Sequence, residues 1–344
     1  MTDDNHLNFR VLLTVFTIVT LGLYLYPTKV NALTLSPTRF EIRGNPGDTL
    51  NEEMLITNET ETAEIYYSSF SNFEAQGDSG SPAFVEPKEG LGTWITTGAA
   101  SIDVAPRQQK IVSFKVDIPK DAEPGGYFAV IFWGTSPAGQ GQVSIGAKTG
   151  ILVLLSVNGE VREEAGLLNF NTIDSKFWYN TLPVSFEYRF KNDGGDRIKP
   201  QGTIKIRDTI FLPTETLDAN PVEGNVLPGS TRKIKVDWIK YERPVDFVEP
   251  TGIFAKFWSD TYYQWKNFAV GLYSANLNVS YGLQEQQVKK TVFFFVFPWQ
   301  LVLVMVLLFI IIFWSGKKLI KRYNRFIIER ARAGINLPPN SLHG

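Results

Sequence analysis

The apolar segment 298–316 constrains this chain more than any other feature of its sequence. Twelve of the thirteen residues in 301–313 are Leu, Ile, Val or Phe, and none carries a charge. Nineteen helical residues span roughly 28 Å at about 1.5 Å each, close to the roughly 30 Å hydrocarbon core of a bilayer. Trp299 and Trp314 stand near the two ends, where interfacial aromatic side chains belong. The sequence predicts a transmembrane helix over residues 297–316.

Basic residues follow this segment. Residues 317–344 contain seven Lys or Arg side chains and one acidic residue, Glu329. Because Lys and Arg beside a membrane helix stay in the cytoplasm, we expect this basic tail inside the cell and the preceding chain outside. Apolar residues recur at helical spacing in the tail, so we expect the helix to continue and lie against anionic lipid.

The N-terminus resembles a secretory signal. An apolar run, 11–25, follows Arg10, and a small-residue cleavage signature ends at Ala32. These features predict a signal peptide over residues 1–32. Acidic residues close to the N-terminus are unusual in such a signal, so an uncleaved second anchor stays open as the alternative.

The predicted exterior, residues 33–296, contains 25 basic and 32 acidic residues. This acidic balance argues against nucleic acid as a partner. The chain has no cysteine, so apolar cores must supply its stability. Short alternating or apolar runs, separated by Gly, Pro, Asn and Asp, recur along the exterior and are typical of antiparallel sandwiches. The predicted fold class is an all-β ectodomain followed by one C-terminal transmembrane helix.

An internal repeat divides the exterior. A strand ending at an Asn turn, a Pro turn leading into a strand, and a Gly/Tyr strand occur twice in the same order. The paired segments are MLITNETE and FEYRFKNDGG, APRQQKIVSFKVDI and LPGSTRKIKVDWI, and GGYFAVIFW and GLYSANLNVSYG. The repeat predicts two tandem immunoglobulin-like sandwiches, over residues 33–157 and 158–296.

The turn motifs carry a resemblance to a family. They are Ser36-Pro37, Pro46-Gly47-Asp48, Asn58, Trp94-Ile95, Pro106, Pro119 and Pro124-Gly125-Gly126-Tyr127. With the second sandwich, the apolar helix and the basic tail, the chain resembles bacterial membrane-anchored surface proteins with tandem immunoglobulin-like domains, similar to the WxL-interacting protein family. The resemblance implies adhesion or scaffolding at the cell wall, with one domain contacting peptidoglycan and the other a protein partner.

Catalytic chemistry finds little support in the sequence. Residues 77–80 (GDSG) spell the nucleophile loop of trypsin-like proteases, but the only histidines, His6 and His343, lie in the predicted signal and tail. The same scarcity of His and Cys argues against transition-metal sites. Carboxylate pairs such as Glu163-Glu164, or Asp193 with Asp196, could bind calcium or hydrolyse a glycoside, although adjacent surface acids are usually solvated. We therefore predict a non-enzyme without catalytic residues, cofactor or metal.

The second domain carries an aromatic insertion, residues 239–270, between its repeated strands. The candidate contact residues for a protein partner are Phe257, Trp258, Tyr262, Tyr263 and Trp265. An extra hairpin with its own small core, a sugar-stacking platform and a belt resting on the bilayer are the alternatives. Asp246, Glu249 and Asp260 are interspersed, and these carboxylates favour a protein contact over lipid.

Together these features predict a non-enzymatic cell-surface protein that binds or scaffolds at the cell envelope. Its partners would be an envelope protein or peptidoglycan, the bilayer, and anionic lipid at the tail. An assembly subunit of a larger membrane complex is the main alternative, and a carboxylate-based cell-wall hydrolase is a further one.

Overall fold

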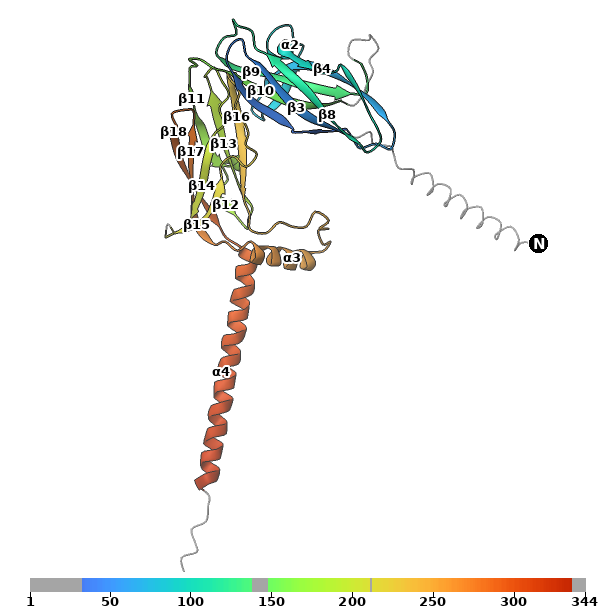
Figure 1. Ribbon diagram of the computed structural model, residues 1–344. Helices are drawn as coiled ribbons and strands as arrows, with labels where there is room; N and C mark the ends of the chain where they lie inside the picture. The colour runs from blue at the N-terminus through green and yellow to red at the C-terminus, as the bar shows by residue number, and fades with distance from the viewer. Residues whose placement is uncertain (1–32, 138–147, 211, 336–344) are drawn as a thin grey trace, which may run out of the picture. The chain divides into compact units, whose positions relative to one another are not determined.

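The computed structural model describes residues 33–137, 148–210 and 212–335 (Figure 1). The predicted signal peptide, residues 1–32, lies outside the described residues. The chain divides into two compact units, which are described separately. The first contains the chain up to Glu74 together with Pro82–Val161, and the second contains Ala75–Ser81 together with the chain from Arg162.

The first unit is a sandwich of two sheets. One sheet has the strand order β1-β3-β8-β6, and the other has the order β2-β10-β9-β4-β5, with β7 paired to β4. The strands are β1 (Leu33–Ser36), β2 (Arg39–Gly44), β3 (Thr49–Asn58), β4 (Glu64–Gln76), β5 (Ser81–Val85), β6 (Ile95–Thr97), β7 (Ser101–Val104), β8 (Gln109–Asp117), β9 (Gly125–Gly134) and β10 (Lys148–Val157). A one-turn helix, α2 (Leu91–Trp94), precedes β6.

Alternation along the strands builds the core of this unit. On β3, Met54 and Ile56 are buried while their neighbours are at least partly exposed, because successive side chains of a strand point to opposite faces. β9 is buried along most of its length, and its Trp133 donates a hydrogen bond to the sulfur of Met54 at 3.2 Å. Phe114 on β8 packs edge-on against Phe40, with ring centroids 5.0 Å apart. Apolar packing holds the two sheets together, as the lack of cysteine requires.

The second unit is also a sandwich, with the sheets β11-β13-β16 and β12-β18-β17-β14-β15. Its strands are β11 (Ala165–Thr172), β12 (Trp178–Tyr179), β13 (Val184–Asn192), β14 (Gln201–Arg207), β15 (Pro213–Asp218), β16 (Ser230–Trp238), β17 (Gly271–Tyr281) and β18 (Gln286–Val296), with a short 3-10 turn, η1 (Ile173–Ser175), before β12. Aromatic rings fill the core between the sheets. Phe294 lies 5.8 Å from Trp238, 5.4 Å from Phe186 and 5.7 Å from Tyr273, measured between ring centroids.

The two units share one strand order. The order β1-β3-β8 corresponds to β11-β13-β16, and the order β2-β10-β9-β4-β5 corresponds to β12-β18-β17-β14-β15, whereas β6 and β7 of the first unit have no counterpart among the sheets of the second. The three repeated sequence patterns lie on equivalent strands of the two units. Each unit also contains a parallel pair, β2 with β10 and β12 with β18, which the repeat did not predict. The chain has an immunoglobulin-like sandwich fold in both units.

A buried asparagine makes the same turn in each unit. Asn58 ends β3, and its Nδ2 donates to the carbonyl oxygens of Thr62 and Val104 at 2.8 and 3.0 Å, while its Oδ1 accepts from the Thr60 amide at 2.9 Å. Asn192 ends β13, and its Nδ2 donates to the carbonyl oxygens of Asp196 and Val226 at 2.8 and 2.9 Å. Its Oδ1 accepts from the Gly194 amide at 2.9 Å. The repeated asparagine therefore has the same structural role in both units: its buried side chain binds the end of the strand to the backbone of neighbouring segments.

Two helices complete the second unit. Helix α3 (Ile253–Lys266) occupies the aromatic insertion, and helix α4 (Trp299–Ile335) follows β18 after two residues. The alternative of an extra hairpin in the insertion is wrong. The predicted continuation of the C-terminal helix beyond residue 316 is confirmed, because α4 extends to Ile335. Within α4, the stretch Trp299–Arg330 is long and apolar enough to cross a membrane. Only 6% of its most apolar 18-residue segment is buried by the rest of the described protein.

Candidate interaction surface beside helix α4

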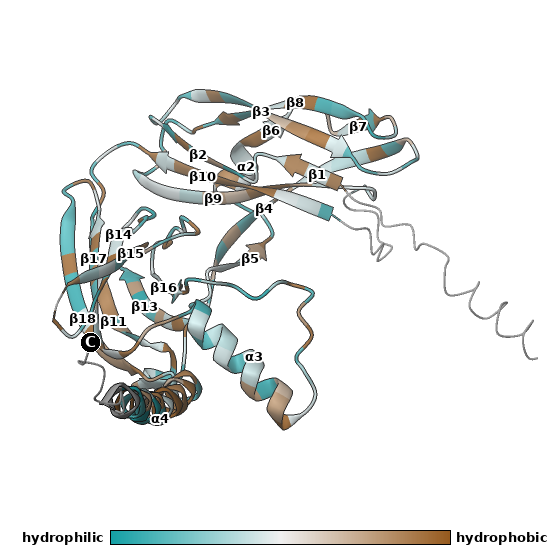
Figure 2. Cartoon of the chain, turned by 90° about the horizontal axis from the view of Figure 1, so that it is seen from below, coloured by the Kyte–Doolittle hydropathy of each residue, from teal (hydrophilic) through white to brown (hydrophobic). Residues whose placement is uncertain are grey.

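The first turn of α3 is built by the residues just before it. Gly252 stands at the N-cap with φ of 116°, a left-handed conformation that glycine adopts without steric cost. The segment 239–252, here called the strap, leads from the end of β16 to this glycine. In Figure 1 the strap runs above α3 and α4 extends below it, and in Figure 2 the strap loops out beside α3, on the side away from α4.

The end of α3 is tied back to the strap. Asn267 is buried, and its Oδ1 accepts hydrogen bonds from the backbone amides of Lys240 and Tyr241 at 3.2 and 3.0 Å. Its Nδ2 donates to the carbonyl oxygen of Tyr241 at 2.9 Å. Lys240 Nζ donates to the carbonyl oxygen of Phe268 at 2.7 Å. These bonds fix the helix against the start of the insertion.

A buried glutamine pair joins α3 to α4. Gln264 Nε2 donates to Gln300 Oε1, and Gln264 Oε1 accepts from the backbone amide of Leu301 at 3.0 Å. The first N–H groups of a helix have no partner inside that helix, so Gln264 caps α4 from outside. The Phe257 ring adds a contact with the Trp299 ring, at a centroid distance of 6.2 Å. Helix α3 is therefore held at the level where α4 begins.

Ion pairs cover the strap side of α3. The Arg243 guanidinium lies 3.3 Å from Asp260 and 3.4 Å from Glu249, and Lys256 Nζ lies 3.9 Å from Glu249. Arg243 also stacks over the Tyr263 ring at 4.4 Å. Burial raises the pKa of Tyr263 above its ordinary value, and the neighbouring Arg243 cation opposes part of that rise. Two of the four acidic residues in the insertion, Glu249 and Asp260, are thus paired with basic side chains rather than presented to a partner.

The five predicted contact residues divide into two groups. Phe257 and Tyr263 are half-buried, in contacts with Trp299 and with the strap. Trp258, Tyr262 and Trp265 are exposed, with 57%, 56% and 62% of their surface accessible. The prediction missed Phe254, which is 83% exposed one turn before Trp258. Phe254, Trp258, Tyr262 and Trp265 are called the aromatic stripe below.

The prediction also missed the glutamine pair and a second aromatic pair. Phe177 and Trp178 are 43% and 61% exposed, and the Trp178 ring lies 4.6 Å from the Phe295 ring near the end of β18. Gln300 was visible in the sequence as a polar residue near the start of the apolar segment 298–316, which otherwise contains only Ser315 as a polar side chain besides its two tryptophans. Its partner Gln264 is distant in the chain, so only the fold brings them together.

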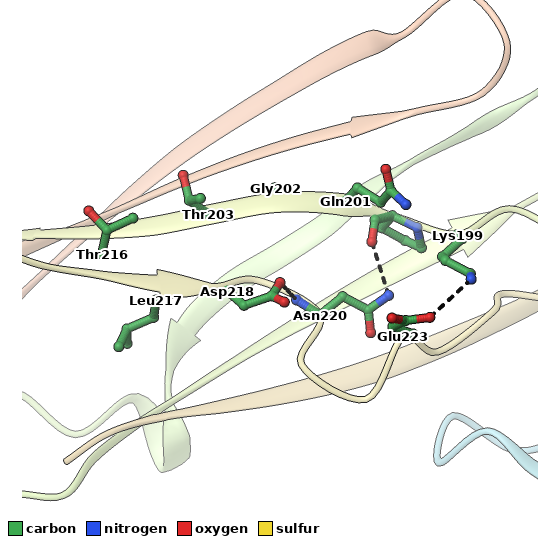
Figure 3. A pocket seen from close by; sticks show the side chains of 10 residues that line it. Lys199, Gln201, Gly202, Thr203, Thr216, Leu217, Asp218, Asn220 and Glu223 are labelled. Atoms are coloured by element: carbon green, nitrogen blue, oxygen red, sulfur yellow. Dashed lines mark hydrogen bonds and ion pairs between the residues drawn. The ribbon is translucent and has the colours of Figure 1, made fainter.

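Other surface features of the described residues offer weaker sites. A hollow of about 500 Å³ lies at the ends of β14 and β15 (Figure 3). Several of its polar groups are paired within the protein: Lys199 Nζ lies 3.4 Å from Glu223, and Asn220 Nδ2 donates to the Pro200 and Gly224 carbonyl oxygens, both at 3.0 Å. We assign no ligand to this hollow.

The carboxylates considered for catalysis have structural partners. Glu164 pairs with Arg162, and Glu163 accepts from the Leu283 amide at 3.0 Å. Asp193 lies 2.9 Å from Lys191 Nζ. Among the described residues, no group of three or more His, Cys, Asp or Glu side chains is arranged to hold a metal ion. In the GDSG segment, Ser79 Oγ lies 2.9 Å from Ser81 Oγ, and both histidines lie outside the described residues.

Comparisons with known proteins find similarity to solved structures only. No protein family model and no curated protein match the sequence. The class 5 fimbriae chaperone CfaA aligns over 76% of this chain and 98% of its own, with 10% identity and a TM-score of 0.36. The chaperone DraB of E. coli aligns over 76% and 97%, with 13% identity and a TM-score of 0.32. The CupB2 chaperone of Pseudomonas aeruginosa aligns over 75% and 98%, with 8% identity and a TM-score of 0.31. The immunoglobulin-like assignment rests on the strand order itself.

Proposed function

We propose that this chain is a non-enzymatic, single-pass membrane protein that presents two immunoglobulin-like sandwiches to a protein partner at the cell envelope. The observation that carries the proposal is the junction between β18 and α4. Two residues separate the last strand of the second unit from a helix whose apolar side chains are largely uncovered, including Phe309 at 70% and Ile312 at 68% exposure. Such a surface in water would be unfavourable by about 25 cal/mol per Å², which supports a lipid environment.

The short junction has a consequence for binding. A long flexible linker would let the sandwich move freely above the membrane, whereas two residues and the Gln264–Gln300 contact hold the second unit close to it. Surfaces of this unit then stand at a constant height above the bilayer. Such an arrangement suits a scaffold that meets a partner in the same membrane or in the adjacent wall. Scaffolding at the cell wall, the role that the resemblance to WxL-interacting proteins implies, agrees with this arrangement and is part of the proposal.

Orientation and tail chemistry belong to the same proposal. Helix α4 is 37 residues long, about 56 Å at about 1.5 Å per residue, so it exceeds the roughly 30 Å hydrocarbon core. The part beyond residue 316 carries the basic side chains and would emerge on the cytoplasmic side, beside anionic headgroups. The two sandwiches would then lie outside the cell.

Crosslinking and a wall assay test the function together. The tagged full chain is crosslinked in intact cells and purified from membranes, and the purified chain is separately incubated with isolated cell wall. We expect a recurrent protein partner crosslinked to the sandwich units, and no release of soluble wall fragments. Release of fragments by the wild-type chain, lost in Glu163→Gln or Asp193→Asn, would contradict the proposal and favour the hydrolase.

A further inference from the structure

The aromatic stripe occupies one side of α3. At about 100° per residue, Phe254, Trp258, Tyr262 and Trp265 fall within about 80° of one another around the helix axis. All four side chains are more than half exposed. A run of four exposed aromatic rings on one helix face is an apolar surface that requires a covering partner.

The other sides of α3 are already occupied. Lys256, Asp260, Tyr263 and Asn267 contact the strap or its ion pairs and lie together on a second side. On the same helical count this second side is nearly opposite the stripe. Phe257 and Gln264, which lie between these two sides, contact the start of α4.

This arrangement gives the stripe a direction. In Figure 1 the strap runs above α3 and α4 extends below it. Because the stripe is nearly opposite the strap side on the helical count, it faces the side of α3 towards which α4 extends. Figure 2 looks at the second unit from the end at which α4 extends, and α3 crosses the view there beside α4, which is seen nearly end-on. The two views agree that α3 runs crosswise to α4.

The two acidic residues nearest to or within α3 no longer argue against lipid at the stripe, whereas Glu242 and Asp246 lie in the strap. In the sequence, Glu249 and Asp260 favoured a protein contact, but both are paired with Arg243 on the strap side. The stripe itself contains Trp, Tyr and Phe and no acidic residue. Trp and Tyr are the residues enriched where a bilayer's hydrocarbon meets its headgroups.

A second aromatic pair lies near the start of α4. β12 pairs with the last two residues of β18, which places exposed Trp178 beside Phe295, four residues before Trp299. Phe297 and Trp299 are themselves 41% and 44% exposed. Aromatic side chains from three separate elements thus gather around the residue at which α4 begins.

We propose that the aromatic stripe of α3 lies in the headgroup region of the outer leaflet, so that the second unit rests on the bilayer through an interfacial helix. The occupant of this surface is the phospholipid bilayer. The inference rests on the proposed membrane anchor and adds a second attachment to it. Amphipathic helices of this kind bury their apolar face about 5–10 Å into the boundary between headgroups and acyl chains.

The absence of cysteine permits a direct test. Single cysteines replace Tyr262 in the stripe, Lys256 on the strap side and Met305 in α4, and each carries an environment-sensitive NBD label. The full chain is reconstituted in phosphatidylcholine nanodiscs, and its label is quenched by lipid nitroxides of known depth or by aqueous iodide. Trp258→Cys and Trp265→Cys repeat the stripe measurement, so one misfolded variant does not decide it.

We expect the labels at positions 258, 262 and 265 to show blue-shifted emission, quenching by shallow lipid nitroxides, and a depth of about 5–10 Å below the headgroup boundary. The label at 256 should be quenched by iodide as in water. Iodide access at the stripe equal to that at 256, with the label at 305 protected, would overturn the inference and leave the anchor standing. Protection of the stripe only in native membranes would assign the surface to a partner protein and also overturn it. Iodide access at 305 would overturn the membrane anchor itself.

Discussion

Replacing Asn58 by alanine tests whether the hydrogen bonds of the buried asparagine side chains stabilise the sandwiches. Asn58 is fully buried, and its side chain joins the end of β3 to the carbonyl oxygens of Val104 and Thr62 and to the amide of Thr60. Its Oδ1 also accepts from the Tyr66 hydroxyl at 3.1 Å. Alanine removes all of these bonds at once and leaves buried polar groups without their partner.

The magnitude follows from the bonds lost. At about 1 kcal/mol net per hydrogen bond, and more where a buried group is left unsatisfied, Asn58→Ala should lower the free energy of unfolding of the first unit by about 3–4 kcal/mol. For a unit of this size that loss lowers Tm by about 6–16 °C. Asn58→Asp retains the acceptor but places a second oxygen against the Val104 carbonyl, so it should destabilise at least as much.

Calorimetry of the full chain in detergent micelles measures this effect. The control is Asn158→Ala, which removes an exposed side chain whose Nδ2 donates to Asn45 Oδ1 at 2.9 Å, and should change stability by at most about 0.5 kcal/mol. Asn192→Ala should reproduce the loss in the transition of the second unit. An Asn58→Ala variant as stable as Asn158→Ala would refute the reasoning.

Three further predictions concern the second unit and the tail. Tyr188 donates to the Ala219 carbonyl oxygen at 3.0 Å, and burial raises the pKa of its hydroxyl well above the ordinary value of about 10. Above about pH 10 the hydroxyl therefore ionises in the unfolded chain but not in the folded one. The free energy of unfolding is unaffected by this group below about pH 10 and falls above it by up to about 1.4 kcal/mol per pH unit. Urea unfolding between pH 9 and 11 should show a shallower fall for Tyr188→Phe, and an unchanged slope would contradict this. Gln264→Leu leaves the Leu301 amide uncapped, so hydrogen exchange should quicken in 253–266 and 299–302, whereas unchanged exchange would show that the cap is dispensable. A peptide of residues 316–334 should bind anionic vesicles with about 1 kcal/mol per basic residue at low salt and detach as salt rises, and equal binding to neutral vesicles would exclude a role for charge.

Local patterns predicted the strands and their turns well. The MLITNETE and FEYRFKNDGG segments end in asparagines whose side chains make matching bonds, because the turn chemistry is contained within a few neighbouring residues. The Pro106 and Pro228 turns likewise lead into equivalent strands, β8 and β16. The parallel pairs could not be predicted, because their strands are far apart in sequence and no local residue encodes the pairing.

The aromatic insertion shows where sequence reasoning failed. Its Trp, Tyr and Phe residues favour strands by propensity, so a hairpin was a reasonable alternative. The spacing of Phe254, Trp258, Tyr262 and Trp265 nevertheless follows a helix, and that period was visible in the sequence. The sequence also could not show where the acidic residues of the insertion lie, because pairing of Asp260 and Glu249 with Arg243 depends on a strap conformation that no local pattern reveals.

Accessibility of single cysteines in intact spheroplasts tests the proposed topology most directly. Ser101→Cys places a thiol at an exposed position of β7, and Lys321→Cys places one on α4 beyond the apolar span. A membrane-impermeant maleimide should label position 101 in intact spheroplasts and position 321 only after the membrane is permeabilised. Labelling of 321 without permeabilisation, with 101 protected, would invert the topology, and labelling of both would show that α4 does not cross the membrane.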